Sequence, residues 1–336
     1  MRTLFLATLL LFSQLTFSQS TAYKNLVFEG AGIRGIAYSG AVDGLEKAGV
    51  LQGIEKYGGT SAGAVIAMTL ALGYDAEEIR SILQETEFQK FNDGNFLGFG
   101  GVRRMKKRYG WYKGDKFVRW LGEIIEAKSG NAELTFAELY AWRGKDLYTV
   151  GTNLTQQTMM VFSRERYPDM KIKDAVRISL SIPLYFEAVF IDEAGNLYDK
   201  PQAGKSLDII VDGGIIGNYP IQIFDSTFVE DGQTIRIPNQ ETLGIKIDDD
   251  EQIQYDNQQQ GLSPREIDSF KSYIEAFYVF ALENLNRAQM QPEDWARTIL
   301  VSSKGIGPKI KKLSGQQVST LVESGRKSVS AYFEAS

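Results

Sequence analysis

Short apolar runs alternate with helix-length segments along most of the chain, and a glycine-rich turn follows several of these runs. Residues 26–28 form an apolar run that enters the glycine turn 30–35, and the segment 36–48 then carries apolar residues at helical spacing. A weaker strand over 54–57 meets a second turn, and 62–72 predicts a buried helix. This repeat of strand, glycine turn and helix is typical of a mostly parallel sheet covered by helices.

The later part of the chain continues the pattern and then changes in composition. Residues 248–262 are polar and charged, which predicts a linker or exposed loop. Ser263 and Glu266 fit a capping box around Pro264, so we expect an amphipathic helix to begin there. Its apolar stripe consists of Ile267, Phe270, Ile274, Phe277 and Ala281, and a second amphipathic helix closes the chain. The other expected elements are a glycine-rich loop over 94–104, helices over 113–130 and 172–182, and strands over 146–154, 158–163, 207–211 and, as the last one, 242–247.

The first residues have the organisation of a secretory signal peptide. A basic residue precedes the apolar run 4–12, and small and polar residues lead to Ser18, where we expect cleavage. The alternative is an uncleaved interfacial anchor, because the run is too short to span a bilayer. We therefore expect a secreted or periplasmic protein. The expected organisation is a signal peptide over 1–18, a three-layer α/β/α domain with a mostly parallel sheet over 22–248, and a linker with a helical C-terminal extension over 249–336.

Composition restricts the chemistry that this chain can perform. The 336 residues contain no histidine and no cysteine, and the net charge is −5. Without these residues the usual zinc and copper sites, thiol nucleophiles and disulfides are excluded, and acid–base work falls to Asp, Glu, Lys or Tyr. The negative charge argues against a nucleic-acid partner. We expect no metal and no organic cofactor.

One turn places a serine between two glycines. Gly59, Ser61 and Gly63 fit the pattern G-x-S-x-G, between an expected strand and an expected helix. A tight turn in that context exposes the serine hydroxyl above the sheet, and small neighbours allow the turn to form. The pattern predicts a nucleophilic Ser61, with the N-cap of the following helix as the structural alternative.

Two further glycine turns follow expected strands. Residues 30–35, GAGIRG, offer backbone N–H groups at a helix start, as an oxyanion hole or a phosphate site requires. The spacing also fits G-x-G-x-x-G, with Glu55 about twenty residues later, which is the pattern of a dinucleotide-binding fold. The other turn, Asp212 with two glycines, stands where open α/β sheets place their sites, although Asp-Gly is also an ordinary turn pair.

A nucleophilic Ser61 needs a base, and histidine is absent. An aspartate within hydrogen-bond reach can accept the proton and later return it. Because the reference pKa of Asp is near 3.9, a desolvated pocket that raises the pKa makes a better base. Lysine is the other candidate, but no lysine stands in a comparable turn. Asp212 is therefore the predicted partner of Ser61.

Four blocks of sequence resemble the patatin-like phospholipases in their order and spacing. They are GAGIRG, GTSAG, SLSIPLYFEAVF and DGGIIGNYP, and the resemblance covers about residues 24 to 225, with weaker similarity to about 248. It implies a lipid acyl hydrolase with a Ser–Asp dyad, with Ser61 as nucleophile and Asp212 as dyad acid. The departure is Ala31, which stands where the family often has a third glycine. The implied oxyanion loop contains Gly30, Gly32, Ile33, Arg34 and Gly35, the supporting turn residues are Gly59, Gly63, Gly213 and Gly214, and the other matches are Pro183, Phe186, Asn218 and Pro220.

The sequence thus predicts a serine hydrolase that cleaves lipid acyl esters of the phospholipase A or carboxylesterase type, with a lipid or membrane-surface substrate. The alternatives are a dinucleotide-binding protein that uses the GAGIRG turn and a catalytically silent interaction protein of the same fold. The basic and aromatic cluster over 103–112 is read as a solvated helix face, with contact to anionic head groups as the alternative. The acidic residues 248–251 are read as a solvated loop, because they lack the spacing of a calcium-binding EF-hand loop.

Overall fold

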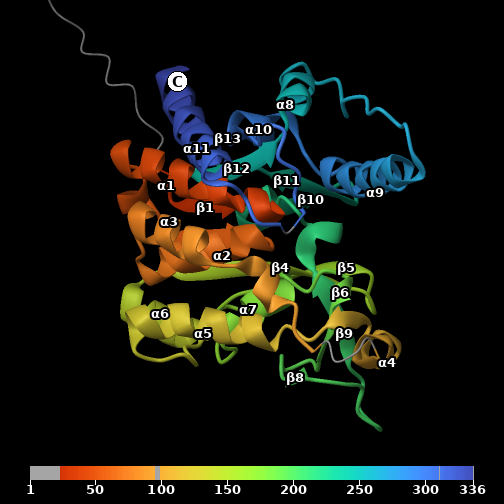
Figure 1. Cartoon of the computed structure of the whole chain (residues 1–336). Helices are drawn as coiled ribbons and strands as arrows, with labels where there is room; N and C mark the ends of the chain where they lie inside the picture. Colours follow the sequence, from red (N-terminus) through yellow and green to blue (C-terminus); the bar gives the residue numbers. More distant parts are fainter. Residues whose placement is uncertain (1–22, 95–98, 310, 336) are drawn as a thin grey trace, which may run out of the picture.

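The protein is built around one mixed sheet that is covered by helices (Figure 1). This computed structural model describes residues 23–94, 99–309 and 311–335. The predicted signal peptide over 1–18 lies outside the described residues and stays a prediction. None of the described helices is long and apolar enough to cross a membrane.

The central sheet is mixed: five consecutive strands are parallel, and antiparallel pairs extend it on one side. Among the described residues it has nine strands in the order β13-β12-β1-β2-β4-β9-β7-β8, with β5 paired to β4. Strands β13, β12, β1, β2 and β4 run parallel to their neighbours in this series, and the other pairs are antiparallel. The bounds are β1 Asn25–Phe28, β2 Lys56–Gly59, β4 Asp146–Asn153, β5 Thr158–Phe162, β7 Val189–Ile191, β8 Leu197–Tyr198, β9 Asp208–Asp212, β12 Thr242–Asp248 and β13 Thr298–Ser302.

Two small sheets flank the central one. Strand β3 pairs in parallel with β6, and β10 forms an antiparallel hairpin with β11. Their bounds are β3 Gly110–Tyr112, β6 Leu184–Phe186, β10 Ser226–Glu230 and β11 Gln233–Ile237.

Helices cover the sheet, and α2 is the most deeply buried of those that form the site. Its sequence AGAVIAMTLAL is apolar throughout except for one threonine, and the helix ends at Gly73, whose φ of 87° is the left-handed cap conformation. The α-helices are α1 Ala37–Lys47, α2 Ala62–Leu72, α3 Ala76–Glu85, α4 Phe99–Arg108, α5 Asp115–Ser129, α6 Phe136–Arg143, α7 Ile172–Ser179, α8 Asp250–Asn257, α9 Phe270–Arg287, α10 Pro292–Ala296 and α11 Gly315–Ala335. Short 3₁₀ helices occupy η1 Gly32–Ile36, η2 Leu51–Gly53, η3 Phe88–Phe91, η4 Gly213–Ile215 and η5 Ile221–Phe224.

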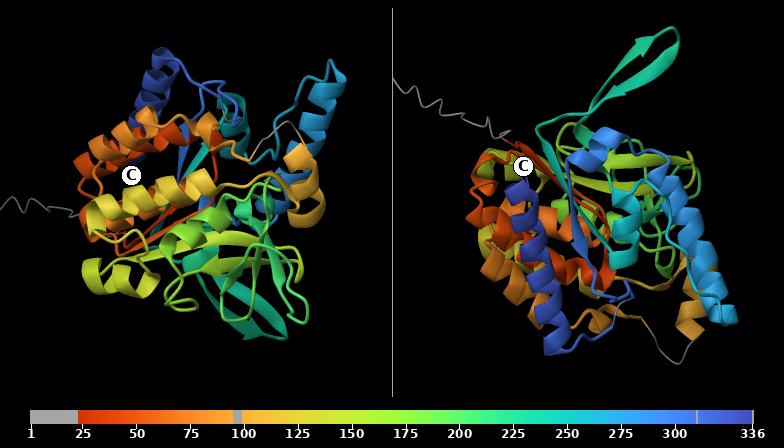
Figure 2. Two further views of the ribbon diagram at one scale, coloured as in Figure 1. Left: turned by 60° about the horizontal axis from the view of Figure 1, so that its bottom comes forward. Right: turned by 90° about the horizontal axis from the view of Figure 1, so that it is seen from above.

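The two faces of β1 bury their side chains in different clusters. Leu26 and Phe28 belong to the large core, which also contains apolar residues of α1, α2 and α11. Val27 points to the other face and packs with Tyr219 and Ile221. The predicted three-layer α/β/α class with a mostly parallel sheet is confirmed by this arrangement (Figure 2).

Several local predictions are wrong in the second half of the chain. Residues 99–104 of the expected loop 94–104 belong to α4, and the expected linker 248–262 contains α8. The capping box at Ser263 does not start a helix, because the Ser263 N–H donates to Oε1 of the buried Gln252 at 2.9 Å. Helix α9 starts at Phe270 instead, capped by Ser269.

The strand over 242–247 is not the last one. Strand β13 follows it and pairs in parallel with β12, so the segment expected to be a helical extension contributes a strand to the central sheet. Helix α11 then packs along α1, where the backbone of Val322 approaches Gly40 so closely that a Cβ would have no room. This strand was missed although its sequence, TILVS, is a short apolar run with β-branched residues of the kind that predicts a strand.

Candidate active site

Ser61 occupies a strained turn between β2 and α2. Its φ of 53° and ψ of −121° lie outside the regions that non-glycine residues favour, a conformation that costs on the order of 1–3 kcal/mol. Gly59 and Gly63 make the turn possible, because neither position has room for a side chain. A Cβ on Gly59 would collide with the backbone of Gly63, and a Cβ on Gly63 would collide with the carbonyl oxygen of Phe28. Ser61 stands at the N-cap of α2 but makes no capping hydrogen bond with its side chain, so the capping alternative is not supported.

Asp212 ends β9 and is held in the same region. Its N–H donates to the Ser181 carbonyl at 2.9 Å, and its Oδ1 accepts the Gly214 N–H at 2.6 Å. Its Oδ2 is buried and accepts no hydrogen bond from the described residues. Gly213 is required here, since a Cβ would lie 2.5 Å from the Val150 carbonyl oxygen.

The environment of Asp212 changes its acidity. Burial raises the pKa of the carboxyl group to about 7, while the Gly214 N–H and a side-chain interaction with the Ser61 hydroxyl lower it. The fold brings the turns of the two predicted dyad residues close together, although they are far apart in the sequence: a Cβ at Gly213 would lie only 2.9 Å from Thr60 Cγ2. Thr60 fixes the two turns to each other, because its hydroxyl donates to the Gly217 carbonyl at 2.6 Å.

The glycine-rich turn 30–35 lies beside Ser61, but its N–H groups are not equivalent. Three of them are already used: Gly30 donates to the Asn218 carbonyl, Ile33 to Pro308 and Arg34 to Ala31, at 2.9, 3.1 and 3.2 Å. An oxyanion role for these three N–H groups is therefore not supported by this geometry. Gly32 and Gly35 line the same pocket as Ser61.

Two backbone N–H groups beside Ser61 are without a hydrogen-bond partner in the described part of the chain. They belong to Gly32 and to Ala62, the residue after Ser61. An acyl-transfer intermediate needs donors of this kind around its oxyanion, and the residue after the nucleophile commonly supplies one. The glycine turn 30–35 alone did not point to Ala62, because the role of the Ala62 N–H depends on how the turn around Ser61 is placed beside it.

The pocket that Ser61 borders has a volume of about 420 Å³ and apolar walls. Phe186 of the predicted third block lines it, whereas Pro183 does not appear in its wall. Much of the wall was not singled out from the sequence, because it comes from separate helices. These residues are Val65, Ile66, Leu83, Phe88, Phe91 and Phe117.

A buried ion pair between Glu29 and Lys246 lies next to the glycine turn 30–35. Glu29, next to Gly30, accepts hydrogen bonds from Lys246 Nζ at 2.6 Å and from the Ile247 N–H at 2.9 Å. Asn218 connects it to the turn, since its Nδ2 donates to Gly30 O at 3.1 Å and lies 3.3 Å from Glu29 Oε1. Lys246 was a missed signal: it is a lysine inside the apolar run LGIKI, and such a lysine needs a buried partner.

The dinucleotide alternative conflicts with the position of Glu55. This residue precedes β2 and its N–H donates to the Lys24 carbonyl, so it lies at the amino end of the parallel strands. The turn 30–35 lies at their carboxyl end, where a ribose-binding acid would have to be. Glu55 cannot therefore serve the turn in the way that pattern requires.

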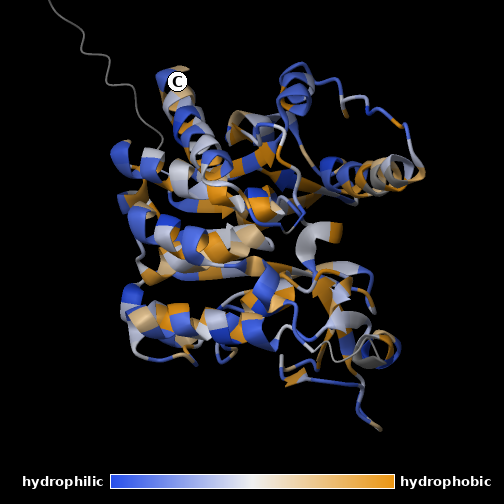
Figure 3. Cartoon of the chain, viewed as in Figure 1, coloured by the Kyte–Doolittle hydropathy of each residue, from blue (hydrophilic) through white to orange (hydrophobic). Residues whose placement is uncertain are grey.

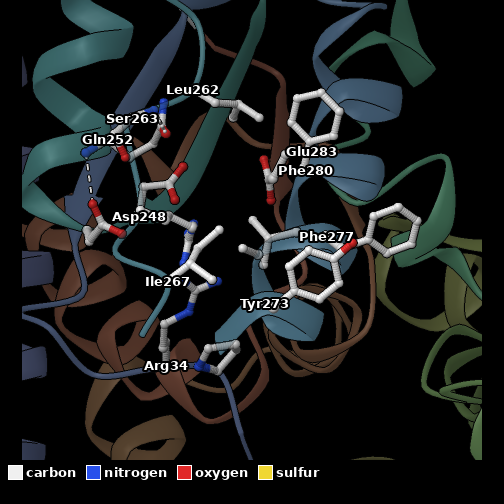
Figure 4. A pocket seen from close by; sticks show the side chains of 15 residues that line it. Arg34, Asp248, Gln252, Leu262, Ser263, Ile267, Tyr273, Phe277, Phe280 and Glu283 are labelled. Atoms are coloured by element: carbon white, nitrogen blue, oxygen red, sulfur yellow. Dashed lines mark hydrogen bonds between the residues drawn. The ribbon is translucent and has the colours of Figure 1, made fainter. Parts of the chain in front are cut away.

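The acidic residues 248–251 are partly paired with cations. Asp248 lies 2.7 Å from Lys246 Nζ and 3.5 Å from Arg287, and Asp250 lies 3.2 Å from Lys304. A second cavity, of about 440 Å³, borders this region and shares Pro308 with the Ser61 pocket (Figure 4). Its wall includes Arg34, Asp248, Glu283, Tyr273, Phe277 and Phe280.

The sequence of this chain is similar to a known protein family and to several known proteins. The family described as Patatin-like phospholipase matches residues 26–225. The uncharacterized protein YqhO of Bacillus subtilis (strain 168) is 33% identical over 213 residues, which cover 60% of this chain and 67% of YqhO. The probable lipid hydrolase 463L of Invertebrate iridescent virus 6 is 28% identical over 207 residues, which cover 60% of this chain and 63% of that protein.

Solved structures share the fold at low sequence identity. VipD from Legionella pneumophila has a TM-score of 0.55 at 17% identity, over 94% of this chain and 67% of that one. ExoU in its heterodimeric complex with SpcU from Pseudomonas aeruginosa has a TM-score of 0.50 at 17% identity, over 94% of this chain and 52% of that one. These likenesses concern the fold, whereas the family match rests on sequence over more than half of the chain. The resemblance found in the four sequence blocks is thereby confirmed, and this chain belongs to the patatin-like phospholipase family.

Proposed function

We propose that this protein is a lipid acyl hydrolase that cleaves carboxylic esters through an acyl-enzyme on Ser61, with Asp212 as general base and then acid. One observation carries the proposal: an uncapped serine in a strained turn and a buried carboxylate with a pKa of about 7 interact beside an apolar pocket. Family membership and the similarity to a probable lipid hydrolase support the same chemistry.

Acylation uses the dyad and the backbone donors. The Ser61 hydroxyl attacks the ester carbonyl carbon while its proton passes to the Asp212 carboxylate. The carbonyl oxygen becomes an oxyanion, which the N–H groups of Gly32 and Ala62 stabilise. When the intermediate collapses, the ester C–O bond breaks and Asp212 returns the proton to the departing alcohol.

Deacylation repeats these steps with water. A water molecule attacks the acyl-Ser61 carbonyl and gives a proton to Asp212, and the same donors stabilise the second oxyanion. Collapse releases the carboxylic acid and restores the Ser61 hydroxyl with the proton from Asp212. A carboxylate base suits this role, because a pKa of about 7 lies near neutral pH, where its two protonation states are both accessible.

The pocket favours an acyl chain as the group that enters. Aromatic and branched side chains line it, among them Ile66, Phe91 and Phe117, and such walls bury methylene groups favourably. This supports a lipid acyl ester rather than a small polar ester as substrate.

Substitution of the dyad tests the proposal. Ser61→Ala and Asp212→Asn should each lower hydrolysis of p-nitrophenyl butyrate by about 1,000-fold or more, because the first removes the nucleophile and the second removes the base. Ser81→Ala, at an exposed serine of α3, is the matched control and should keep full activity. Full activity of either dyad variant would refute the mechanism.

The two rival functions predict different observations. A fluorophosphonate probe should label the wild-type protein but not Ser61→Ala, whereas a catalytically silent protein would remain unlabelled. A dinucleotide-binding protein would copurify with or bind nicotinamide or flavin, which an absorbance scan detects. Labelling at Ser61 without such absorbance is the expected result.

A further inference from the structure

Helix α9 turns an apolar stripe toward solvent. Phe270, Tyr273, Ile274, Phe277 and Phe280 recur at helical spacing and are 80%, 54%, 46%, 65% and 63% exposed. In a soluble protein such a stripe normally faces the core. Tyr273, Phe277 and Phe280 also border the cavity of about 440 Å³ described above, so they are exposed at its rim. Figure 3 shows apolar segments along α9. Of the stripe predicted from the sequence, Phe270, Ile274, Phe277 and Ala281 lie in α9, whereas Ile267 precedes the helix. No partner for this face is found among the described residues.

The exposed stripe belongs to a helix that is firmly attached at its other end. The side chain of Asn286 accepts the Asn218 N–H at 2.6 Å and lies 3.4 Å from the Gly214 carbonyl oxygen, next to the Asp212 turn. Arg287 pairs with the buried carboxylate of Asp256. These contacts of Asn286 and Arg287 hold the C-terminal end of α9 against the rest of the protein, and the helix keeps its apolar stripe exposed in this position.

Helix α4 brings unpaired positive charge to the same edge of the molecule. Arg104 and Arg108 pair with Glu187, but Arg103, Lys106 and Lys107 are exposed and have no ion pair among the residues that the structure describes. These cations stand out in a chain whose net charge is −5. An anionic surface would complement them.

The two helices lie on either side of the Ser61 site. Gly110, just after α4, pairs with Leu184, an exposed leucine whose neighbours Ile182 and Tyr185 line the Ser61 pocket. Helix α9 is attached beside the Asp212 turn, as described above. Both helices lie along the edge where the parallel strands end, on the right of Figure 1, and the views of Figure 2 agree.

We propose that the α9 stripe, Leu184 and the cations Arg103, Lys106 and Lys107 form a docking face for the surface of an anionic phospholipid bilayer. The inference rests on the proposed function, because an acyl chain must leave a bilayer to reach Ser61. The aromatic and aliphatic side chains enter the interface, while the three cations contact the phosphate groups of the lipids. Docking places the Ser61 pocket against the surface that holds the substrate.

Vesicle binding of the full-length chain tests the proposal. Binding is measured by cosedimentation with phosphatidylglycerol and phosphatidylcholine vesicles, in the Ser61→Ala background so that lipid stays intact. The parent should bind phosphatidylglycerol vesicles, and the triple variant Arg103→Gln, Lys106→Gln, Lys107→Gln should bind them about 100-fold more weakly at low salt. The double variant Phe270→Ser, Phe277→Ser should lose about tenfold or more on both lipids.

Matched controls separate this face from general surface effects. Lys327→Gln on α11 and Trp142→Ser on α6 change exposed residues elsewhere and should leave vesicle binding unchanged. In the Ser61-containing chain, all four variants should hydrolyse soluble p-nitrophenyl butyrate at the wild-type rate. Failure of hydrolysis with intact vesicle binding would remove the proposed function and leave the docking face standing.

Two results would overturn the docking face. One is a parent chain that ignores phosphatidylglycerol vesicles, and the other is binding that neither set of substitutions weakens. An oligomer that dissociates in Phe270→Ser, Phe277→Ser while vesicle binding is absent would assign the stripe to a second copy of the chain instead.

Discussion

The backbone N–H of Ile33 donates a hydrogen bond of 3.1 Å to the carbonyl oxygen of Pro308. This bond joins the glycine turn beside Ser61 to the segment between β13 and α11. The family match ends at residue 225, so a part of the chain beyond the match contacts the site and lines its pocket. The candidate site is therefore completed by residues outside the part of the chain that matches the family.

A chain that ends at residue 248 should fail to fold. It lacks β13, which pairs with β12, and α11, which covers α1 and buries Leu321 and Val329. Loss of these contacts exposes a broad apolar face of α1 to water. Circular dichroism and urea unfolding compare residues 23–248 with residues 23–336. A soluble short chain that unfolds cooperatively and hydrolyses esters would show that the C-terminal part is dispensable.

Activity should rise with pH through neutrality. Asp212 accepts a proton only as the carboxylate, and its pKa is raised to about 7 by burial. Protonation below that pH removes the base, so kcat/KM should fall about tenfold for each pH unit on the acidic side. The profile of p-nitrophenyl butyrate hydrolysis measures this directly. A midpoint near the ordinary pKa of an exposed aspartate would contradict the buried, desolvated base.

The same pKa shift should make stability depend on pH. The folded protein keeps the Asp212 proton up to about pH 7, whereas the unfolded chain loses it near pH 4, so ionisation of Asp212 lowers the stability of the wild type as pH rises between these values. Asp212→Asn cannot ionise. Its free energy of unfolding relative to the wild type should therefore increase by as much as about 4 kcal/mol from about pH 4 to above pH 7.

Urea unfolding of both proteins across that range checks the prediction. The constant cost of replacing a carboxylate oxygen with an NH₂ group cancels in the comparison, because it is the same at every pH. Parallel pH profiles for Asp212→Asn and the wild type would place the pKa of Asp212 near its ordinary value.

Much of the fold could be predicted from the sequence because its signals are local. The strand before the turn 30–35 and the all-apolar helix α2 depend on neighbours along the chain, and α2 was predicted with its observed bounds. The absence of histidine also directed attention to Asp212. The pairing of β13 with β12 and the burial of Gln252 depend on distant contacts, which local patterns do not contain, whereas the strand itself was overlooked in the apolar run TILVS.

The turns that form the candidate site were predicted for the same reason, while the catalytic roles assigned to their residues stay predictions. The residues that share a turn with Ser61 or Asp212 were recognisable, since glycine at fixed spacing reports a close backbone approach. The backbone donors at the pocket were harder to predict. Whether an N–H of the turn 30–35 is free depends on the carbonyl groups of Asn218 and Pro308, which lie far away in the sequence. The ion pair of Glu29 with Lys246 was missed because its two members lie on different strands.

Substitutions of the two members of the Glu29–Lys246 ion pair should lower the free energy of unfolding by different amounts. Lys246→Met leaves the buried carboxylate of Glu29 without its cation and should destabilise the fold by about 3–5 kcal/mol. Glu29→Gln leaves Lys246 with Asp248 at 2.7 Å, so its cost should be smaller, about 1–3 kcal/mol. Urea unfolding gives both values, and the double variant should cost less than their sum. Strict additivity would mean that the two side chains do not interact.

The length of the acyl chain should determine the rate until the pocket is full. Each methylene buried between Ile66, Phe91 and Phe117 contributes about 0.8 kcal/mol, so kcat/KM should rise about fourfold per added CH₂ in a series of p-nitrophenyl esters. Leu83→Trp fills part of the pocket and should lower kcat/KM for long chains about tenfold, with butyrate changed by less than about twofold. Leu83→Ile keeps the volume and serves as the control. An equal loss on every chain length would mean that the acyl group binds elsewhere, because a pocket shortened at Leu83 can only discriminate against chains that reach it.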